Sequence, residues 1–374
     1  MTASIDGTTG ITFNDASVQN TAATGFGFKN RIINGAMVID QRNAGASISV
    51  SSSGYPVDRM KCWADGGGVF TAQQSTTVPS TTTFTNSSVL TVTTPDSSLA
   101  ANDFYGITQY IEGYNVADFG FGTAVASPIT LSFWVQSSVT GTYSVAFGNS
   151  DGATRSYIAT YTITAANTWE NKTITIPGDT TGTWLKTTAT GLRVWFALGM
   201  GSTYITASPN AWIASAAIQS SSSVNWISTT GATFYITGVQ LEKGSTATSF
   251  DYRPYGTELM LCQRYFANLL AAGTDYNIGV TRDSTTATQF VLYAPVTMRA
   301  TPTLGVPSGY GRIVAYDTSF GITVNAVTSM VLLFTADNRI LNIFTGTASY
   351  GGQYVYSAYD TVGATTAMTL SSEL

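Results

Sequence analysis

Paired carboxylates are the first residues in this sequence that could do chemistry. Hydrolysis of a glycosidic bond needs two acidic side chains about 5 to 9.5 Å apart, one of them with a raised pKa. Two groups of acids in the predicted sandwich domain are candidates: Asp103 with Glu112 and Asp118, and Glu242 with Asp251. Neither stands in a recognisable catalytic motif, so we interpret both as solvated or ion-paired carboxylates and predict no catalytic residue and no enzyme.

Other reactive combinations are sparse. The chain has no histidine, which removes the commonest general base and excludes a Ser-His-Asp triad within one chain. Cys62 and Cys262 are far apart and match no metal or redox spacing, so we expect buried free thiols rather than a disulfide. Gly-rich pieces such as GYGR, residues 309–312, lack the spacing and lysine of a phosphate-binding loop. We predict no metal and no cofactor.

Aromatic side chains are the better candidates for function. Sugars present apolar C–H faces that stack on Trp and Tyr, while their hydroxyls bond to neutral polar side chains. Two groups of aromatics are candidates for glycan binding, one in the loop-rich stretch 181–230 and one in the last 70 residues: Trp184, Tyr204, Trp212 and Trp226; Tyr310, Tyr316, Tyr350, Tyr354, Tyr356 and Tyr359. The alternative for each is packing in a core or in a subunit interface.

Composition limits the partners. The net charge is −5, and charged residues are only 10% of the 374, with no basic patch that could neutralise phosphates, so we expect no nucleic-acid binding. The longest apolar runs, such as Met330–Phe334, are too short to span a bilayer, so we expect no membrane insertion. The N-terminal MTASIDGTTG lacks the basic and apolar regions of a secretory signal.

The elements that must position these side chains are mostly strands. In ITLSFWVQ, residues 129–136, apolar and polar positions alternate, with four side chains predicted on one face: Ile129, Leu131, Phe133 and Val135. Such segments follow one another too closely for crossover helices, which favours antiparallel pairing. An all-β fold, with a jelly-roll-like β-sandwich over 27–254, is therefore expected.

A change of pattern marks the domain boundaries. GTELMLCQRYFANLL, residues 256–270, has an apolar stripe at helical spacing after Pro254, which predicts a short linking helix within 255–272. Short strands resume after it and predict a second, C-terminal β-sandwich over 273–374. Residues 1–26 read as a short β segment that cannot form a core alone, so its order should depend on association.

Three stretches resemble bacteriophage tail-fibre and virion structural proteins. GITFNDASVQNTAA, residues 10–23, is similar to a segment near the N-termini of tail fibres. FKNRIINGAMVIDQRNAGASISV with YPVDRMKCW, within 28–63, resembles the opening of their sandwich domain, and FYITGVQLEKGSTATSFDYRPYGTELMLCQRYF, residues 234–266, resembles its end. Met60 departs from the family, which more often has Trp there, and we expect it to fill a similar core gap.

The resemblance implies a homotrimeric fibre in which 1–26 attaches to other tail or baseplate proteins and trimerises. It also implies a sandwich similar to carbohydrate-binding modules and a C-terminal tip, 273–374, that contacts the host. Such modules often hold a structural calcium, for which NSDGAT, residues 149–154, could supply oxygens, but we interpret that segment as a hairpin turn.

The leading functional hypothesis is therefore a non-enzymatic virion tail appendage, assembled in the host cytoplasm, that binds a host surface polysaccharide. One alternative is a tailspike depolymerase, and another is a decoration or baseplate protein that binds no receptor. Charges in the resembling stretches are interpreted as structural: we expect Asp40, Arg42, Asp58 and Arg59 to pair with one another or with Glu242, Asp251 and Arg253 at the sandwich edge.

Overall fold

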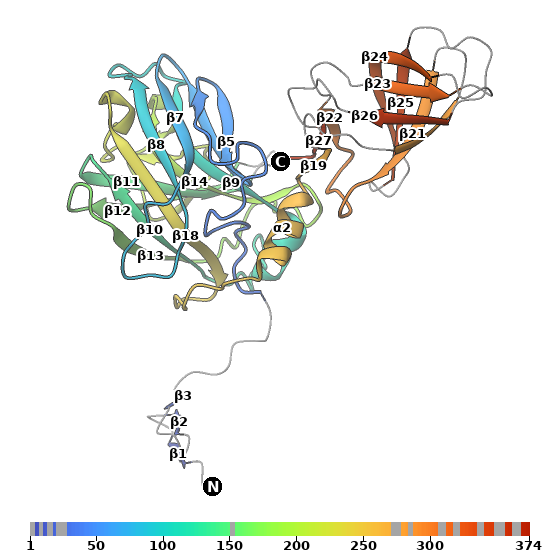
Figure 1. The fold of residues 1–374 in the computed structure, drawn as a ribbon. Helices are drawn as coiled ribbons and strands as arrows, with labels where there is room; N and C mark the ends of the chain where they lie inside the picture. Colours follow the sequence, from blue (N-terminus) through green and yellow to red (C-terminus); the bar gives the residue numbers. More distant parts are fainter. Residues whose placement is uncertain are drawn as a thin grey trace.

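The computed structural model describes residues 4–6, 10–12, 18–19, 28–149, 154–270, 278–282, 287–305, 312–316, 322–334, 340–347, 356–360 and 368–374, with side chains described for 28–149, 154–269, 293–305 and 368–374. The fold is all-β, as expected (Figure 1). Its helices are short: α1 (Gly113–Val116), α2 (Tyr255–Gln263) and the 3-10 turns η1 (Ala117–Phe119), η2 (Ser202–Tyr204) and η3 (Trp226–Ser228). No helix in the described part of the chain has the length and apolar character to cross a bilayer.

Two antiparallel sheets form the large sandwich. The six-stranded sheet has the order β13 (Glu170–Ile176), β10 (Ile129–Ser137), β18 (Thr233–Lys243), β8 (Ser87–Thr94), β7 (Val69–Ser75) and β4 (Ile48–Val50). The seven-stranded sheet has the order β16 (Trp212–Ile213), β12 (Ser156–Ile163), β11 (Gly141–Gly148), β14 (Thr190–Met200), β9 (Phe104–Glu112), β6 (Met60–Asp65) and β5 (Ser53–Val57). A small parallel pair, β15 (Ile205–Thr206) and β17 (Gln219–Ser220), lies in the segment between β14 and β18.

The core of the sandwich follows the predicted alternation. Ile129, Leu131, Phe133 and Val135 on β10 are each fully buried, whereas Ser132, Trp134 and Gln136 are half-buried. Phe133 packs edge-on against Phe196 of β14, with ring centroids 5.0 Å apart, so the rings interlock across the two sheets. The predicted face of β10 is thus confirmed.

Helix α2 begins one residue earlier and ends seven residues earlier than the apolar stripe suggested. Residues Phe266–Leu270 form strand β19, which pairs with β27 (Met368–Ser371) about 100 residues later in the sequence. The backbone N–H of Ser372 donates to the carbonyl of Tyr265 (2.7 Å), and Ala267 is fully buried. This pairing satisfies the backbone hydrogen-bonding groups of residues 266–270 outside a helix, so the helix ends at Gln263. The local spacing of apolar residues cannot predict such a distant partner.

The strands after α2 form two units. β19, β27 and β22 (Thr303–Gly305) make a three-stranded sheet, and a closed six-stranded barrel has the order β20 (Ile278–Arg282), β21 (Ala287–Tyr293), β25 (Ile340–Thr347), β24 (Ile322–Phe334), β23 (Arg312–Tyr316) and β26 (Tyr356–Asp360). The expected antiparallel strands are present, but they close into a barrel instead of two facing sheets. Closure pairs both edge strands, and alternation along single strands does not report it.

The last strand of the chain is not part of the barrel, and the role predicted for 273–374 as a receptor-binding tip is not tested. The last described strand, β27, returns to β19 beside the sandwich, where Figure 1 shows the chain end. Arg42 and Arg59 of the sandwich both pair with Glu373.

The N-terminal segment forms a small antiparallel sheet of β1 (Ser4–Asp6), β2 (Gly10–Thr12) and β3 (Val18–Gln19), consistent with the predicted β segment.

Candidate functional site

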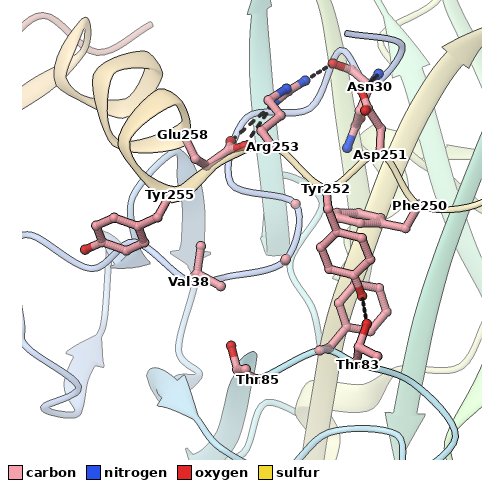
Figure 2. A pocket seen from close by; sticks show the side chains of 13 residues that line it. Asn30, Val38, Thr83, Thr85, Phe250, Asp251, Tyr252, Arg253, Tyr255 and Glu258 are labelled. Carbon is pink, nitrogen blue, oxygen red and sulfur yellow. Dashed lines mark hydrogen bonds and ion pairs between the residues drawn. The ribbon is translucent and has the colours of Figure 1, made fainter.

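A cavity of about 230 Å³ opens beside α2, where the start and the end of the sandwich meet (Figure 2). Its lining comes from three parts of the chain that are distant in sequence: the segment before β4, the loop between β7 and β8, and the segment from β18 into α2. These residues line it: Asn30, Gly35, Ala36, Val38, Thr83, Phe84, Thr85, Phe250, Asp251, Tyr252, Arg253, Tyr255 and Glu258.

Asn30 and Asp251 hold the two ends of the sandwich together behind this cavity. The Asn30 amide donates to the carbonyl of Val239 (3.0 Å), and its oxygen accepts from the N–H of Leu241 (3.0 Å), both on β18. Oδ2 of Asp251 accepts from the N–H groups of Lys29 (2.8 Å) and Asn30 (3.2 Å). Because the Asn30 amide and Oδ2 of Asp251 are satisfied inside the fold, we assign these groups a positioning role.

Arg253 and Glu258 form the charged wall. The Arg253 side chain is 4% exposed. Its Nη1 donates to Glu258 (3.2 Å) and to the carbonyl of Ile32 (3.1 Å), and its Nη2 donates to the carbonyl of Asn30. Glu258 also accepts from the N–H of Asn34. The guanidinium is therefore engaged by a carboxylate and two carbonyls, and the pair braces the first turn of α2 against the sandwich.

Three aromatic rings form the opposite wall. Phe84 packs against Phe250 with centroids 5.0 Å apart and against Tyr252 at 5.6 Å, and Phe250 packs against Tyr252 at 4.9 Å. Gly238 on β18 has φ +60°, and a Cβ there would lie 2.5 Å from the Phe84 ring. Glycine at 238 thus permits both this backbone conformation and the close approach of Phe84.

Two tyrosines give the cavity an accessible aromatic surface. Tyr252 is 53% exposed and Tyr255 is 64% exposed. The Tyr252 hydroxyl shares a hydrogen bond with Oγ1 of Thr83 (2.7 Å), which fixes the ring beside the opening, and Figure 2 shows Tyr255 on the other side, next to α2. An accessible aromatic wall facing polar groups can stack on one face of a small amphipathic ring and hydrogen-bond its edge.

The predicted tryptophans lie elsewhere and are mostly packed. Trp226 is fully buried between the sheets, 5.9 Å from the Phe70 ring, so it is a core residue. Trp184 is 9% exposed and packs against Trp212 (5.4 Å), and their indole N–H groups donate to backbone carbonyls. Tyr204 packs edge-on against Phe104. Tyr204 and Trp212 are half-buried, and none of the four residues is tested as a ligand contact.

The C-terminal tyrosines are not tested as ligand contacts. Tyr310, Tyr350 and Tyr354 lie outside the described residues. Tyr316 and Tyr356 are directly paired on neighbouring barrel strands, and Tyr359 is paired with Ile313, but their side chains are outside the described set. These positions stay candidates.

The acids considered for catalysis have structural partners. Glu112 accepts two hydrogen bonds from Arg264 (2.8 and 2.9 Å) and one from the Tyr265 hydroxyl (2.5 Å), and Asp118 pairs with Arg31 (2.9 Å). Asp103 accepts from the N–H of Ala100 (2.7 Å).

The second acid group is arranged in the same way. Glu242 accepts from the N–H and hydroxyl of Thr248 (2.9 and 2.8 Å), while Asp251 serves the backbone contacts given above. Glu112 and Asp118 are thus ion-paired, whereas Asp103, Glu242 and Asp251 accept hydrogen bonds from neutral donors of the described residues; the absence of a catalytic role stays a prediction.

No three His, Cys, Asp or Glu side chains gather as metal ligands would among the residues the structure describes. Of the NSDGAT segment, residues 150–153 lie outside the described residues, so neither the turn nor the calcium alternative is tested. Cys62 and Cys262 are both free and buried, as predicted, and burial raises the pKa of each thiol.

The four charges near the start of the sandwich are structural, with one partner that we did not predict. Arg42 pairs with Asp58 (2.8 Å) and with Glu373 (2.7 Å), and the fully buried Arg59 also pairs with Glu373. Asp40 instead accepts from backbone N–H groups of its own turn. Burial raises the pKa of Asp58 to about 6, although Arg42 and Gln41 oppose this shift.

Sequence reasoning did not select the cavity residues as a binding site, although it named Asp251 and Arg253 as structural charges. A sequence signal for the cavity was nevertheless present in SFDYRPYG, residues 249–256. Three aromatic and two charged residues fall within these eight positions of a charge-poor chain. We interpreted that segment as a domain join. Phe84, in the polar run TTTFTN, carries no signal until folding places it beside Phe250.

Comparisons with known proteins show similarity to carbohydrate-binding and tailspike structures. The enzymatically active domain of bacteriophage CBA120 tailspike protein 4 matches with 16% identity and a TM-score of 0.32, over 57% of this chain and 21% of the tailspike chain. A family 11 carbohydrate-binding module from a cellulosomal cellulase of Clostridium thermocellum matches with 9% identity and a TM-score of 0.28, over 56% of this chain and 100% of the module. At these TM-scores the matches carry no information about function or site.

No protein-family model matches the sequence, and no curated protein matches it.

Proposed function

We propose that this protein is a bacteriophage tail fibre, or a related virion appendage, that binds a host surface glycan without hydrolysing it. The observation that carries the proposal is the cavity beside α2, in which two exposed tyrosines, Tyr252 and Tyr255, face polar side chains. Most of the lining belongs to the two sequence stretches that resemble tail-fibre proteins, Phe28–Trp63 and Phe234–Phe266.

The cavity suits one sugar ring. Its 230 Å³ is smaller than the roughly 300–1,000 Å³ typical of sites for drug-sized ligands. One sugar ring stacked on Tyr252 would bind weakly. Useful affinity therefore needs several such sites acting together. A homotrimer attached to tail or baseplate proteins through residues 1–26 would present three sites, and several fibres on one particle would make later contacts effectively intramolecular.

A non-enzymatic role is supported by the surroundings of the acids. A glycosidase needs one carboxyl group free to donate a proton and a second free to attack or activate water. Glu112 is instead held by Arg264 and Tyr265, and Glu242 by Thr248. A tailspike depolymerase remains the alternative, and it predicts shortened chains when the protein is incubated with polysaccharide.

The test is a bacterial glycan array probed with the full chain and two single variants. Tyr252→Ala removes the ring at the cavity and is expected to weaken binding about tenfold through lost stacking and contact area. Tyr114→Ala is the matched control, because Tyr114 is also exposed, at 64% against 53% for Tyr252, but lies on α1 outside the cavity lining. A blank array for the unaltered protein, or equal losses in both variants, would contradict the proposal.

A further inference from the structure

We propose that the cavity beside α2 selects neutral and amino sugars and rejects acidic sugars such as uronic acids, with Asp251 as the residue that sets this preference. The inference rests on the proposed glycan-binding function and deepens it by naming the class of sugar. It is argued from which polar atoms of the lining are free to contact a ligand.

The cation of the lining is not available to a ligand. Arg253 is the one Lys or Arg residue among the lining residues. Its Nη1 and Nη2 donate to Glu258 and the carbonyls of Ile32 and Asn30, and its Nε, which has no partner among the described residues, is buried out of reach of the opening. A carboxylate on the sugar is held most strongly by a charged donor, as Arg and Lys supply. Without one, its desolvation on entering the cavity would go uncompensated.

Asp251 offers an acceptor instead. The half-buried Asp251 uses Oδ2 for the two backbone N–H groups of Lys29 and Asn30, and none of the described residues donates a hydrogen bond to Oδ1. Two carboxylates against one guanidinium leave the lining with an excess of negative charge. A sugar hydroxyl can donate to such an oxygen, and a protonated amino group can donate with the added strength of a charged bond.

The rest of the lining fits a donor-rich ligand. Thr85 donates its hydroxyl hydrogen to Asn86 (2.8 Å), so its oxygen is left as an acceptor. Thr83 and Tyr252 share one hydrogen bond, and the rings of Phe84, Phe250 and Tyr252 make the facing wall apolar. The arrangement matches a ring with one C–H face and hydroxyl or ammonium groups along one edge.

The experiment compares three sugars that differ at a single group. Glucose, glucosamine and glucuronic acid, and the corresponding galactose series, are titrated at pH 6.5 into the full chain with saturation-transfer NMR. In the series that binds, the amino sugar is expected to bind at least as tightly as the neutral sugar, and the uronic acid roughly five- to tenfold more weakly.

Two variants assign the preference to Asp251. Asp251→Asn keeps an oxygen for the Lys29 and Asn30 amides but removes the charge, and it should restore most of the lost binding of the uronic acid and weaken that of the amino sugar. Asp65→Asn changes the net charge equally at an exposed position outside the cavity lining and should change neither.

Each result decides between the proposals. Equal binding of the three sugars by the unaltered protein overturns the preference and leaves the glycan-binding function standing. If Asp251→Asn and Asp65→Asn change the preference equally, overall charge is its cause. That result likewise overturns the role of Asp251 and leaves the glycan-binding function standing. Failure of every sugar to bind, together with a blank glycan array, overturns both. The ranking on the unaltered protein tests the inference even if Asp251→Asn does not fold.

Discussion

Individual charges in this chain serve mainly to hold segments together. Glu112 is 1% exposed and is held by Arg264 and Tyr265, which join β9 to the end of α2. Only 10% of the residues are charged. Each ion pair therefore links two particular segments and is not part of an extended surface network. Breaking one buried partner leaves the other uncompensated, which is more costly than removing both.

Arg264→Met is therefore expected to destabilise the sandwich by about 3 kcal/mol, because it leaves the Glu112 carboxylate buried without its cation. The double variant Arg264→Met with Glu112→Gln should recover part of this loss. Urea unfolding followed by tryptophan fluorescence measures both. An unchanged midpoint for the single variant would show that this pair does not hold α2 to β9.

Asp58 predicts a pH dependence of known sign. Its pKa is about 6 in the folded protein against 3.8 for an ordinary aspartate, mainly because it is buried. Protonation therefore favours the folded state: this contribution is complete below pH 3.8 and is lost as the pH rises to about 6. The maximum is about 3 kcal/mol.

The difference in unfolding free energy between the unaltered protein and Asp58→Asn, followed from pH 3.5 to 7.5, isolates this contribution. The unaltered protein should lose stability relative to the variant as the pH rises through this window. A difference that is flat with pH, or that changes in the opposite direction, would contradict the assignment.

At the scale of the elements, local pattern predicted the strands well and their partners poorly. The buried face of β10 follows from the alternation of apolar and polar residues. The early end of α2 does not, because β19 depends on a strand about 100 residues away. Barrel closure likewise depends on the pairing of β20 with β26, and neither strand encodes that partner by itself.

The C-terminal residues after β27, above all Glu373, join the sheet of β19, β27 and β22 to the sandwich. Glu373→Gln removes the charge that pairs with Arg42 and Arg59 and should speed amide hydrogen exchange in β19 and β27. Exchange in β10 and β18 should not change, because their hydrogen bonds are within the sandwich. Asp65→Asn is the control for a lost surface carboxylate. Unchanged exchange in β19 and β27 would show that Glu373 does not stabilise this sheet against the sandwich.

At the scale of the whole molecule, the candidate site exists only after the sandwich closes. Gly35 and Val38 lie near the start of the domain, Phe84 lies in a loop, and Tyr252 and Tyr255 lie more than 200 residues after the first of these. Sequence reasoning proposed aromatic stacking and placed it partly on Trp184 and Trp226, which the fold buries, and not on the exposed Tyr252 and Tyr255. Exposure depends on three-dimensional packing, which spacing along the chain does not specify.

The proposed homotrimer predicts a mass in solution of three chains. Analytical ultracentrifugation of the full chain should show one species of about three times 39.4 kDa, and removal of residues 1–26 should shift it toward the monomer. A monomer at all concentrations would contradict the avidity mechanism, because single weak sites would then act alone.

The central claim is that the cavity beside α2 holds a sugar. Its most direct test is a crystal structure of the full chain with the best-binding saccharide from the array. We predict a sugar ring stacked on Tyr252 with a hydroxyl or amino group at Oδ1 of Asp251. A sugar bound on the barrel or on the outer face of the seven-stranded sheet, with the cavity unaltered, would contradict the account.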